Sequence, residues 1–183
     1  MRADIFWSQA EAELATRPDV LSSLRHGASL NDLDRWSRSV DAPLPANLRE
    51  MYAIHDGTEV RGLHRFSFIA EWYPLPVEIA IERYEQWREM SNLLGPLPLI
   101  PFAVDPGGCY LAAPGDGTNE LYKIFFDAPP ALYDFYTFPP SLEGLLQATI
   151  DGLRGNSPDY RIQLNEQSMS WINLEEEADD LGN

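Results

Sequence analysis

Closely spaced turns divide residues 98–140 into short segments, and this spacing constrains the fold more than any other feature of the chain. Asp105 is followed by Pro-Gly-Gly, and Pro114 is followed by Gly-Asp-Gly. Such sequences favour the tight turns that connect antiparallel strands. The spacing therefore predicts four strands, over residues 99–104, 109–113, 120–126 and 132–138.

Apolar residues recur at helical spacing on both sides of this region. Stripes of this kind begin at Phe6, Leu33 and Leu48, and another runs through 142–153. Ser29 and Ser141 are residues that favour helix starts, because a serine hydroxyl can accept a hydrogen bond from a free backbone N–H. One more strand is expected over 63–69. The fold class predicted is α+β, with a single mixed, mainly antiparallel sheet flanked by helices.

The segment 77–94 combines an apolar face with an acidic face. Apolar residues at helical spacing predict that the first face packs on the protein body. Like charges four residues apart slightly destabilise a helix, so the acidic face costs stability without a local return. The apolar stripe is Val77, Ala80, Ile81, Tyr84 and Trp87, and the acidic stripe is Glu78, Glu82, Glu85 and Glu89.

The charge balance limits what the chain can bind. With 29 acidic and 13 basic residues, the net charge is −16. This charge would repel a nucleic-acid backbone and an anionic membrane surface, and it would attract a basic protein. The alternative is that the acidity serves solubility alone.

Several features favour a cytoplasmic protein. Cys109 is the single cysteine, so no disulfide can form within the chain. Residues 1–14 lack the pattern of a signal peptide, and no apolar run is long enough for a membrane span. Residues 1–157 are expected to form one domain, and 158–183 an acidic, partly disordered C-terminal extension.

No catalytic signature is present, and no catalytic residue, metal ligand or cofactor is predicted. His26, His55 and His64 are far apart along the chain, and each is expected at a surface or a helix end. Residues 116–120 are rich in oxygen ligands, but they lack the ligand spacing of a calcium loop, and Asp-Gly is common in hairpin turns. A hydrolase with dispersed carboxylates stays open as an alternative, because carboxylate pairs are defined by spacing in the fold.

Three motifs in order carry a resemblance to a known family. In the first, residues 44–52 combine Leu-Pro with an amphipathic helix and are followed by His55-Asp56-Gly57. In the second, residues 100–105 precede Gly107-Gly108 and a returning strand. In the third, the aromatic-rich residues 133–138 lead into the helix 141–153. Together they resemble the SUKH superfamily, which includes bacterial toxin-immunity proteins and fungal cell-wall-assembly regulators.

The resemblance implies a mixed sheet flanked by helices and no enzymatic activity. It also implies an immunity protein that neutralises a cognate toxin, often a nuclease, by occlusion; a regulatory scaffold for protein–protein interactions is the alternative. A basic toxin surface would suit the negative charge of this chain. The oligomeric state is left open. The expected contact residues are Asp56, Glu59, Glu78, Glu82, Glu85, Glu89, Asp105 and Asp116.

Overall fold

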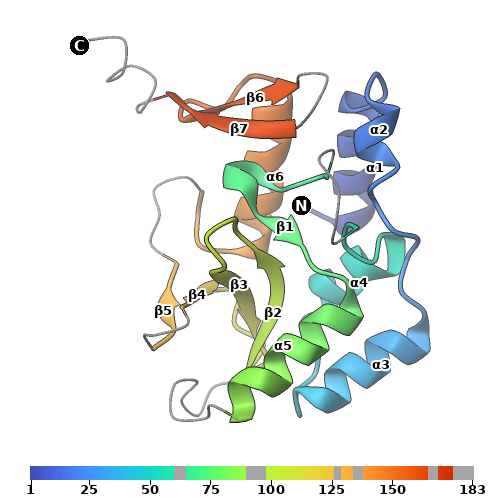
Figure 1. Cartoon of the computed structure of the whole chain (residues 1–183), viewed down its shortest axis with the longest axis vertical. Coiled ribbons are helices and arrows are strands. Elements are labelled where there is room, and N and C mark those ends of the chain that lie inside the picture. Colours follow the sequence, from blue (N-terminus) through green and yellow to red (C-terminus); the bar gives the residue numbers. More distant parts are fainter. Residues whose placement is uncertain (60–64, 90–97, 126–128, 134–137, 165–168, 175–183) are drawn as a thin grey trace.

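The structure is a computed structural model that describes residues 1–59, 65–89, 98–125, 129–133, 138–164 and 169–174. Helices come first, strands dominate the middle, and a helix and a hairpin follow (Figure 1). The helices are α1 (Ala3–Glu13), α2 (Pro18–Leu21), α3 (Leu30–Ser39), α4 (Ala46–Ile54), η1 (Ile69–Glu71, a 3₁₀ turn), α5 (Val77–Glu89) and α6 (Leu142–Leu153). The strands are β1 (Tyr73–Pro74), β2 (Leu99–Val104), β3 (Tyr110–Pro114), β4 (Tyr122–Ile124), β5 (Ala131–Leu132), β6 (Tyr160–Leu164) and β7 (Met169–Asn173).

The predicted helices form where their caps and apolar stripes indicate. The Ser29 hydroxyl accepts the Asp32 N–H at the start of α3, and the Ser141 hydroxyl accepts the Gly144 N–H at the start of α6. Helix α1 packs on α4, and the buried Trp7 indole donates a hydrogen bond to the Met51 carbonyl at 3.1 Å. These contacts confirm the predicted helical regions at both ends of the strand region.

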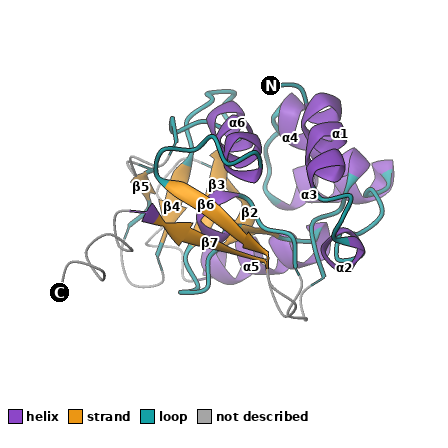
Figure 2. Ribbon diagram, turned by 90° about the horizontal axis from the view of Figure 1, so that it is seen from above, coloured by secondary structure: helices purple, strands orange, loops and turns teal. Residues whose placement is uncertain are grey.

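A five-stranded sheet follows the order β1-β2-β3-β4-β5, and every neighbouring pair is antiparallel. In its centre, Leu99 pairs with Pro114 and Val104 pairs with Tyr110. Helix α4 is tied to this sheet by the Tyr52 hydroxyl, which donates to the Phe102 carbonyl at 2.7 Å. Figure 2 shows α1, α4 and α6 grouped together, with α5 apart from them across the sheet. The α+β class with antiparallel strands is confirmed.

Two predicted strands differ from the structure. Within 63–69, the described residues 65–69 contain only an isolated bridge from Phe68 to Trp72, because the chain reverses between them. Ala70 and Glu71 make that reversal with left-handed φ values of 57° and 60°. The strand expected over 132–138 is limited in the described residues to the short β5, and 134–137 lie outside them.

A second, two-stranded sheet lies where the sequence was assigned to a C-terminal extension. Strands β6 and β7 pair antiparallel and lie against α6 and η1. Met169 and Trp171 are buried in the core, and the Trp171 indole donates to the Ser67 hydroxyl at 3.0 Å. The expectation of one sheet is therefore wrong, because apolar residues of 160–173 complete the core. The acidic residues 175–183 lie outside the described part of the chain.

Candidate protein-binding surface

Helix α5 presents four of the predicted contact residues to solvent. Its inner face is fixed by two buried aromatic side chains, which confirms the predicted packing. The Tyr84 hydroxyl donates to the Val40 carbonyl at 3.2 Å, and the Trp87 ring meets the Tyr110 ring edge-on, with centroids 4.7 Å apart. We call the exposed residues Glu78, Glu82, Glu85 and Glu89 the α5 acidic face.

Most of the charge of the α5 acidic face is uncompensated. Among the described residues, Glu82, Glu85 and Glu89 make no ion pair. Glu82 accepts a hydrogen bond at 2.9 Å from the neutral amide of Gln86, whose own oxygen accepts from Arg83. A rigid helix thus holds a row of carboxylates that are available to a cation from outside.

The neighbouring helix α3 has acidic residues that are already paired. It packs beside α5 (Figure 1). The Asp34 carboxylate lies 2.6 Å from the Arg49 guanidinium, and that of Asp32 lies 3.5 Å from Arg35. Both acids within α3 are therefore paired with arginines, whereas Glu82, Glu85 and Glu89 of α5 make no ion pair among the described residues.

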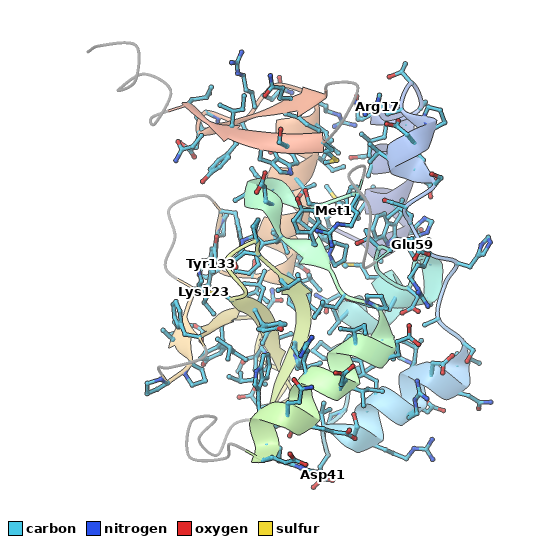
Figure 3. The ribbon with its side chains drawn as sticks, viewed as in Figure 1. Met1, Arg17, Asp41, Glu59, Lys123 and Tyr133 are labelled. Atoms are coloured by element: carbon cyan, nitrogen blue, oxygen red, sulfur yellow. The ribbon has the colours of Figure 1, made fainter. Side chains whose placement is uncertain are left out.

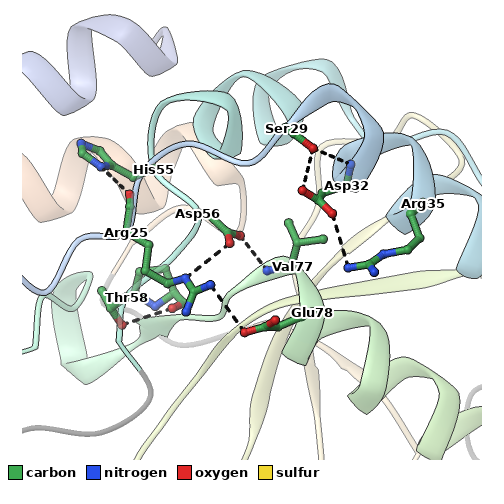
Figure 4. Close-up of polar contacts among 10 residues, drawn as sticks. Arg25, Ser29, Asp32, Arg35, His55, Asp56, Thr58, Val77 and Glu78 are labelled. Carbon is green, nitrogen blue, oxygen red and sulfur yellow. Dashed lines mark hydrogen bonds and ion pairs between the residues drawn. The ribbon is translucent and has the colours of Figure 1, made fainter.

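Asp56 lies at the start of α5, where it has a structural role (Figure 4). Its carboxylate accepts the Val77 N–H at 2.7 Å and lies 3.4 Å from the Arg25 guanidinium. Burial raises the pKa of Asp56, while the Val77 hydrogen bond and the charge of Arg25 oppose that rise. Arg25 also reaches Glu78 at 3.5 Å. Asp56 therefore caps and orients α5, and little of its charge faces solvent.

A histidine extends this junction to α1. The His55 ring nitrogens lie 3.0 Å from the Arg25 carbonyl oxygen, through Nδ1, and 2.7 Å from the Glu11 carboxylate, through Nε2. The ring also packs edge-on against Trp7, with centroids 4.7 Å apart. The end of α4, the segment around Arg25 and the start of α5 are consequently fixed to α1 by a continuous polar network.

Asp105 is also engaged within the protein. Its carboxylate accepts the Cys109 N–H at 2.8 Å, which closes the turn between β2 and β3, and it lies 3.3 Å from the Lys123 ammonium. Only 17% of the Asp105 side chain and 13% of the Lys123 side chain are exposed. The ammonium lies 5.3 Å from the Trp72 ring centroid. The pair stabilises the hairpin and leaves Asp105 little charge to offer.

Asp116 and Glu59 are exposed; Asp116 lies away from the other acids, whereas Glu59 is three residues from Asp56 and lies outside α5. Asp116 accepts hydrogen bonds from the N–H and hydroxyl of Thr118, which lower its pKa. Asp116 follows β3, whereas Asp105 precedes β3. The two aspartates are therefore separated by the length of a five-residue strand, about 17 Å. Glu59 lines a polar groove of about 450 Å³ with Arg25. Figure 3 shows Glu59 and Lys123 on different sides of the molecule.

The predicted contact residues therefore form one group and three separate positions. The four glutamates of the α5 acidic face lie together, with Asp56 at their N-terminal end. Asp105, Asp116 and Glu59 belong to other turns and loops. The structure assigns a structural role to Asp56 and Asp105, and the role of the eight residues in binding stays a prediction.

In the described part of the chain, two cations that sequence reasoning missed engage predicted contact acids. Arg25 comes from the segment after α2, and Lys123 comes from β4. Lys123 is the single lysine of the chain. That rarity was the one sequence signal that could have drawn attention to it, but composition does not reveal which acid it pairs with. Both ion pairs join residues that are far apart in sequence.

The described residues contain no group of three His, Cys, Asp or Glu side chains able to hold a metal ion. None of the described helices has the length and apolar character needed to cross a membrane. The raised carboxylate pKa among these residues belongs to Asp56, which caps α5.

Comparisons with known proteins give one informative match. No family model matches the chain. Over 75 residues the chain is 31% identical to a glucan synthesis regulatory protein of Neurospora crassa. The match covers 41% of this chain and 14% of that protein. A part of the chain is therefore similar to a small part of a protein named as a regulator.

Proposed function

We propose that this protein is an immunity protein that binds a basic toxin through the α5 acidic face and neutralises it by occlusion. The observation that carries the proposal is the row of exposed glutamates on α5, in a chain with net charge −16. Glu78 lies near Arg25, and the other three glutamates make no ion pair among the described residues. The buried Tyr84 and Trp87 hold this row in place, so binding requires no rearrangement of the helix.

The electrostatics of α5 favour a cationic partner. The pairs Glu78–Glu82 and Glu85–Glu89 each place like charges four residues apart, which costs about 0.2–0.5 kcal/mol per pair. Basic side chains of a partner would remove this repulsion on binding. A nuclease has a basic surface that binds phosphate, so an acidic helix can attract and cover it.

The comparison supports the regulatory character of the proposal and also a second function. The similar protein is named as a regulator of glucan synthesis. The SUKH resemblance of residues 44–57 and 100–108 joins fungal cell-wall-assembly regulators and bacterial immunity proteins in one superfamily. A regulatory scaffold that binds a cellular protein is therefore the second candidate, and it would use the same acidic face.

The test begins with the partner. The tagged full-length chain would be used to recover bound proteins from its native host, and the recovered protein would be purified and assayed as a toxin. Inhibition of a toxic activity by stoichiometric amounts of this protein supports immunity. A partner without toxic activity would favour the scaffold.

Variants then locate the interface. Reversal of two charges in Glu82→Lys/Glu85→Lys should weaken binding, because the partner's basic groups would meet like charges. Glu50→Lys/Glu120→Lys is the matched control, since both residues are exposed acids outside α5 and the net charge changes by the same amount. If the α5 variant binds as tightly as the control, the α5 acidic face is not the interface.

A further inference from the structure

A groove runs beside α6, on the side of the helix opposite its buried leucines. Its volume is about 490 Å³. Phe138 and Pro139 line one part, Pro158 lines another, and the small side chain of Ala148 leaves the space between them open. We call this the α6 groove. A volume of this size accommodates two or three side chains of a bound segment.

Two carboxylates lie among these apolar walls. Asp159 is half-buried, and its backbone is fixed, because its N–H donates to the Ser157 hydroxyl and its carbonyl accepts the Leu174 N–H. Its carboxylate makes no hydrogen bond or ion pair with any other described residue. Asp151, also half-buried, accepts one hydrogen bond at 3.0 Å, from the neutral amide of Gln147.

The protein supplies no cation to these carboxylates in its described part. No lining residue is basic. Arg154, at the C-terminal end of α6 and three residues beyond Asp151, is directed elsewhere, because its guanidinium lies 2.8 Å from the Glu13 carboxylate on α1. The α6 groove therefore joins apolar walls to two half-buried negative charges that have no counter-charge among the described residues.

We propose that the α6 groove binds an arginine side chain flanked by apolar residues, on an extended segment of a partner protein. The arginine stem packs against Ala148 and the two prolines, and its guanidinium lies between Asp151 and Asp159. A planar guanidinium with five donors can serve both carboxylates at once, whereas a lysine ammonium is a single point charge. The apolar neighbours of the arginine occupy the space beside Phe138.

This site is distinct from the α5 acidic face. Helix α6 packs on α1, β6 and η1, whereas α5 packs on α3 and β2. The α5 acidic face is an open row of charges suited to a broad basic surface, and the α6 groove is a concave site for one side chain with its neighbours. A result against one leaves the other unchanged.

The test uses a fluorescein-labelled peptide, Leu-Leu-Arg-Pro-Leu, and the full-length protein. A second peptide carries citrulline in place of arginine, which keeps the shape and removes the charge. Fluorescence anisotropy at physiological ionic strength would measure binding of both. We expect the arginine peptide to bind and the citrulline peptide to bind about tenfold more weakly, the loss typical of one charge-assisted hydrogen-bonded contact.

Variants separate the α6 groove from general attraction to an acidic protein. Asp159→Asn should weaken binding of the arginine peptide about tenfold. Ala148→Leu should weaken binding of both peptides, because the larger side chain fills the α6 groove. Glu85→Gln removes the same charge from α5 and should leave binding unchanged. Thermal melts check that each variant is folded.

Four outcomes would overturn the proposal. They are no binding of the arginine peptide, equal binding of the citrulline peptide, equal weakening by Asp159→Asn and Glu85→Gln, and displacement of the peptide by the polyamine spermidine at the same concentration as by unlabelled peptide. The last outcome would identify a site for small cations, without a role for the apolar walls.

Discussion

The Asp56 carboxylate accepts the Val77 N–H at 2.7 Å, and this one contact joins the end of α4 to the start of α5. A helix start has N–H groups that lack partners within the helix, and a carboxylate at that place satisfies one of them and interacts favourably with the helix dipole. The direction in which the α5 acidic face points therefore depends on a residue outside α5.

Removing this cap should destabilise the protein. Asp56→Ala loses the hydrogen bond to Val77 and leaves Arg25 without its closest carboxylate, so we expect a loss of about 1–2 kcal/mol in the free energy of unfolding. Asp56→Asn keeps an oxygen acceptor and should cost less. Urea unfolding of both variants measures the difference, with Glu50→Ala as a surface control. Equal losses for Ala and Asn would show that the cap oxygen contributes little.

The same residue gives a pH dependence with a definite sign. Burial raises the pKa of Asp56 in the folded protein above its ordinary value of 3.8, so the folded state binds the proton more tightly than the unfolded state. The stability that protonation adds is fully present below pH 3.8 and is lost as the pH rises through the raised pKa. The wild type should therefore gain stability relative to Asp56→Asn as the pH falls from 7 toward 3.8.

Unfolding free energies at several pH values, measured for both proteins, test this dependence. A difference between the two proteins that stays constant with pH, or that changes in favour of Asp56→Asn on acidification, would contradict the assignment of a raised pKa.

The hairpin of β6 and β7 should be necessary for stability, and the last residues should not. A truncation that ends at Ser157 removes Met169 and Trp171 from the core, a loss of about 3–6 kcal/mol from apolar burial alone. A truncation that ends at Glu177 removes few apolar groups and should melt with the full chain. Thermal melts followed by circular dichroism distinguish them. A large drop in the melting temperature of the chain that ends at Glu177 would show that the final residues pack on the protein.

Ala70 should be a position where glycine stabilises the protein. Its φ of 57° is left-handed, which costs an alanine roughly 1–2 kcal/mol, whereas glycine adopts it freely. Glycine also has more freedom to lose on folding, by about 0.4–1 kcal/mol, so Ala70→Gly should gain on the order of 0.5–1 kcal/mol. Ala53→Gly, on the exposed side of α4, is the control and should destabilise. A loss at both positions would contradict the strained reversal.

Association with a basic partner should depend on salt. Screening shortens to about 8 Å at physiological ionic strength, so steering by the α5 acidic face weakens as salt is added. Stopped-flow association rates of the wild type should fall with added salt. The association rate of Glu82→Lys/Glu85→Lys should be lower at low salt and should fall less steeply. The dissociation rates should change less. Rates that do not depend on salt in either protein would indicate that the negative charge serves solubility alone.

Much of the fold was predictable because its signals are local. The caps at Ser29 and Ser141, the stripe from Val77 to Trp87 and the turn after Asp105 each act within a few residues, and the structure has helices or strands beside all of them. The strand expected over 63–69 failed for the opposite reason. The Ile69 N–H donates to the Thr149 hydroxyl instead of to a neighbouring strand, and the left-handed Ala70 reverses the chain, so the alternating pattern there does not form a strand.

The candidate site was predictable only as a stripe on one helix. The spacing of Glu78, Glu82, Glu85 and Glu89 places them on one face, which needs no knowledge of the rest of the chain. The same sequence reasoning grouped Asp56 and Asp105 with them. Those two acids differ from most of the glutamates because each is paired with a cation from a distant segment: Asp56 with Arg25, and Asp105 with Lys123.

The sequence by itself determined the antiparallel α+β class, the helix caps, the net charge and the acidic stripe, because each depends on neighbouring residues or on composition. Only the tertiary structure decided which carboxylates stay available. A carboxylate keeps its charge for a partner when no cation of the same chain pairs with it, and that depends on contacts such as Asp56 with Arg25 and Asp105 with Lys123. It likewise placed Trp171 over Gly152, and so turned part of an expected tail into core, because burial is a property of the whole packed chain.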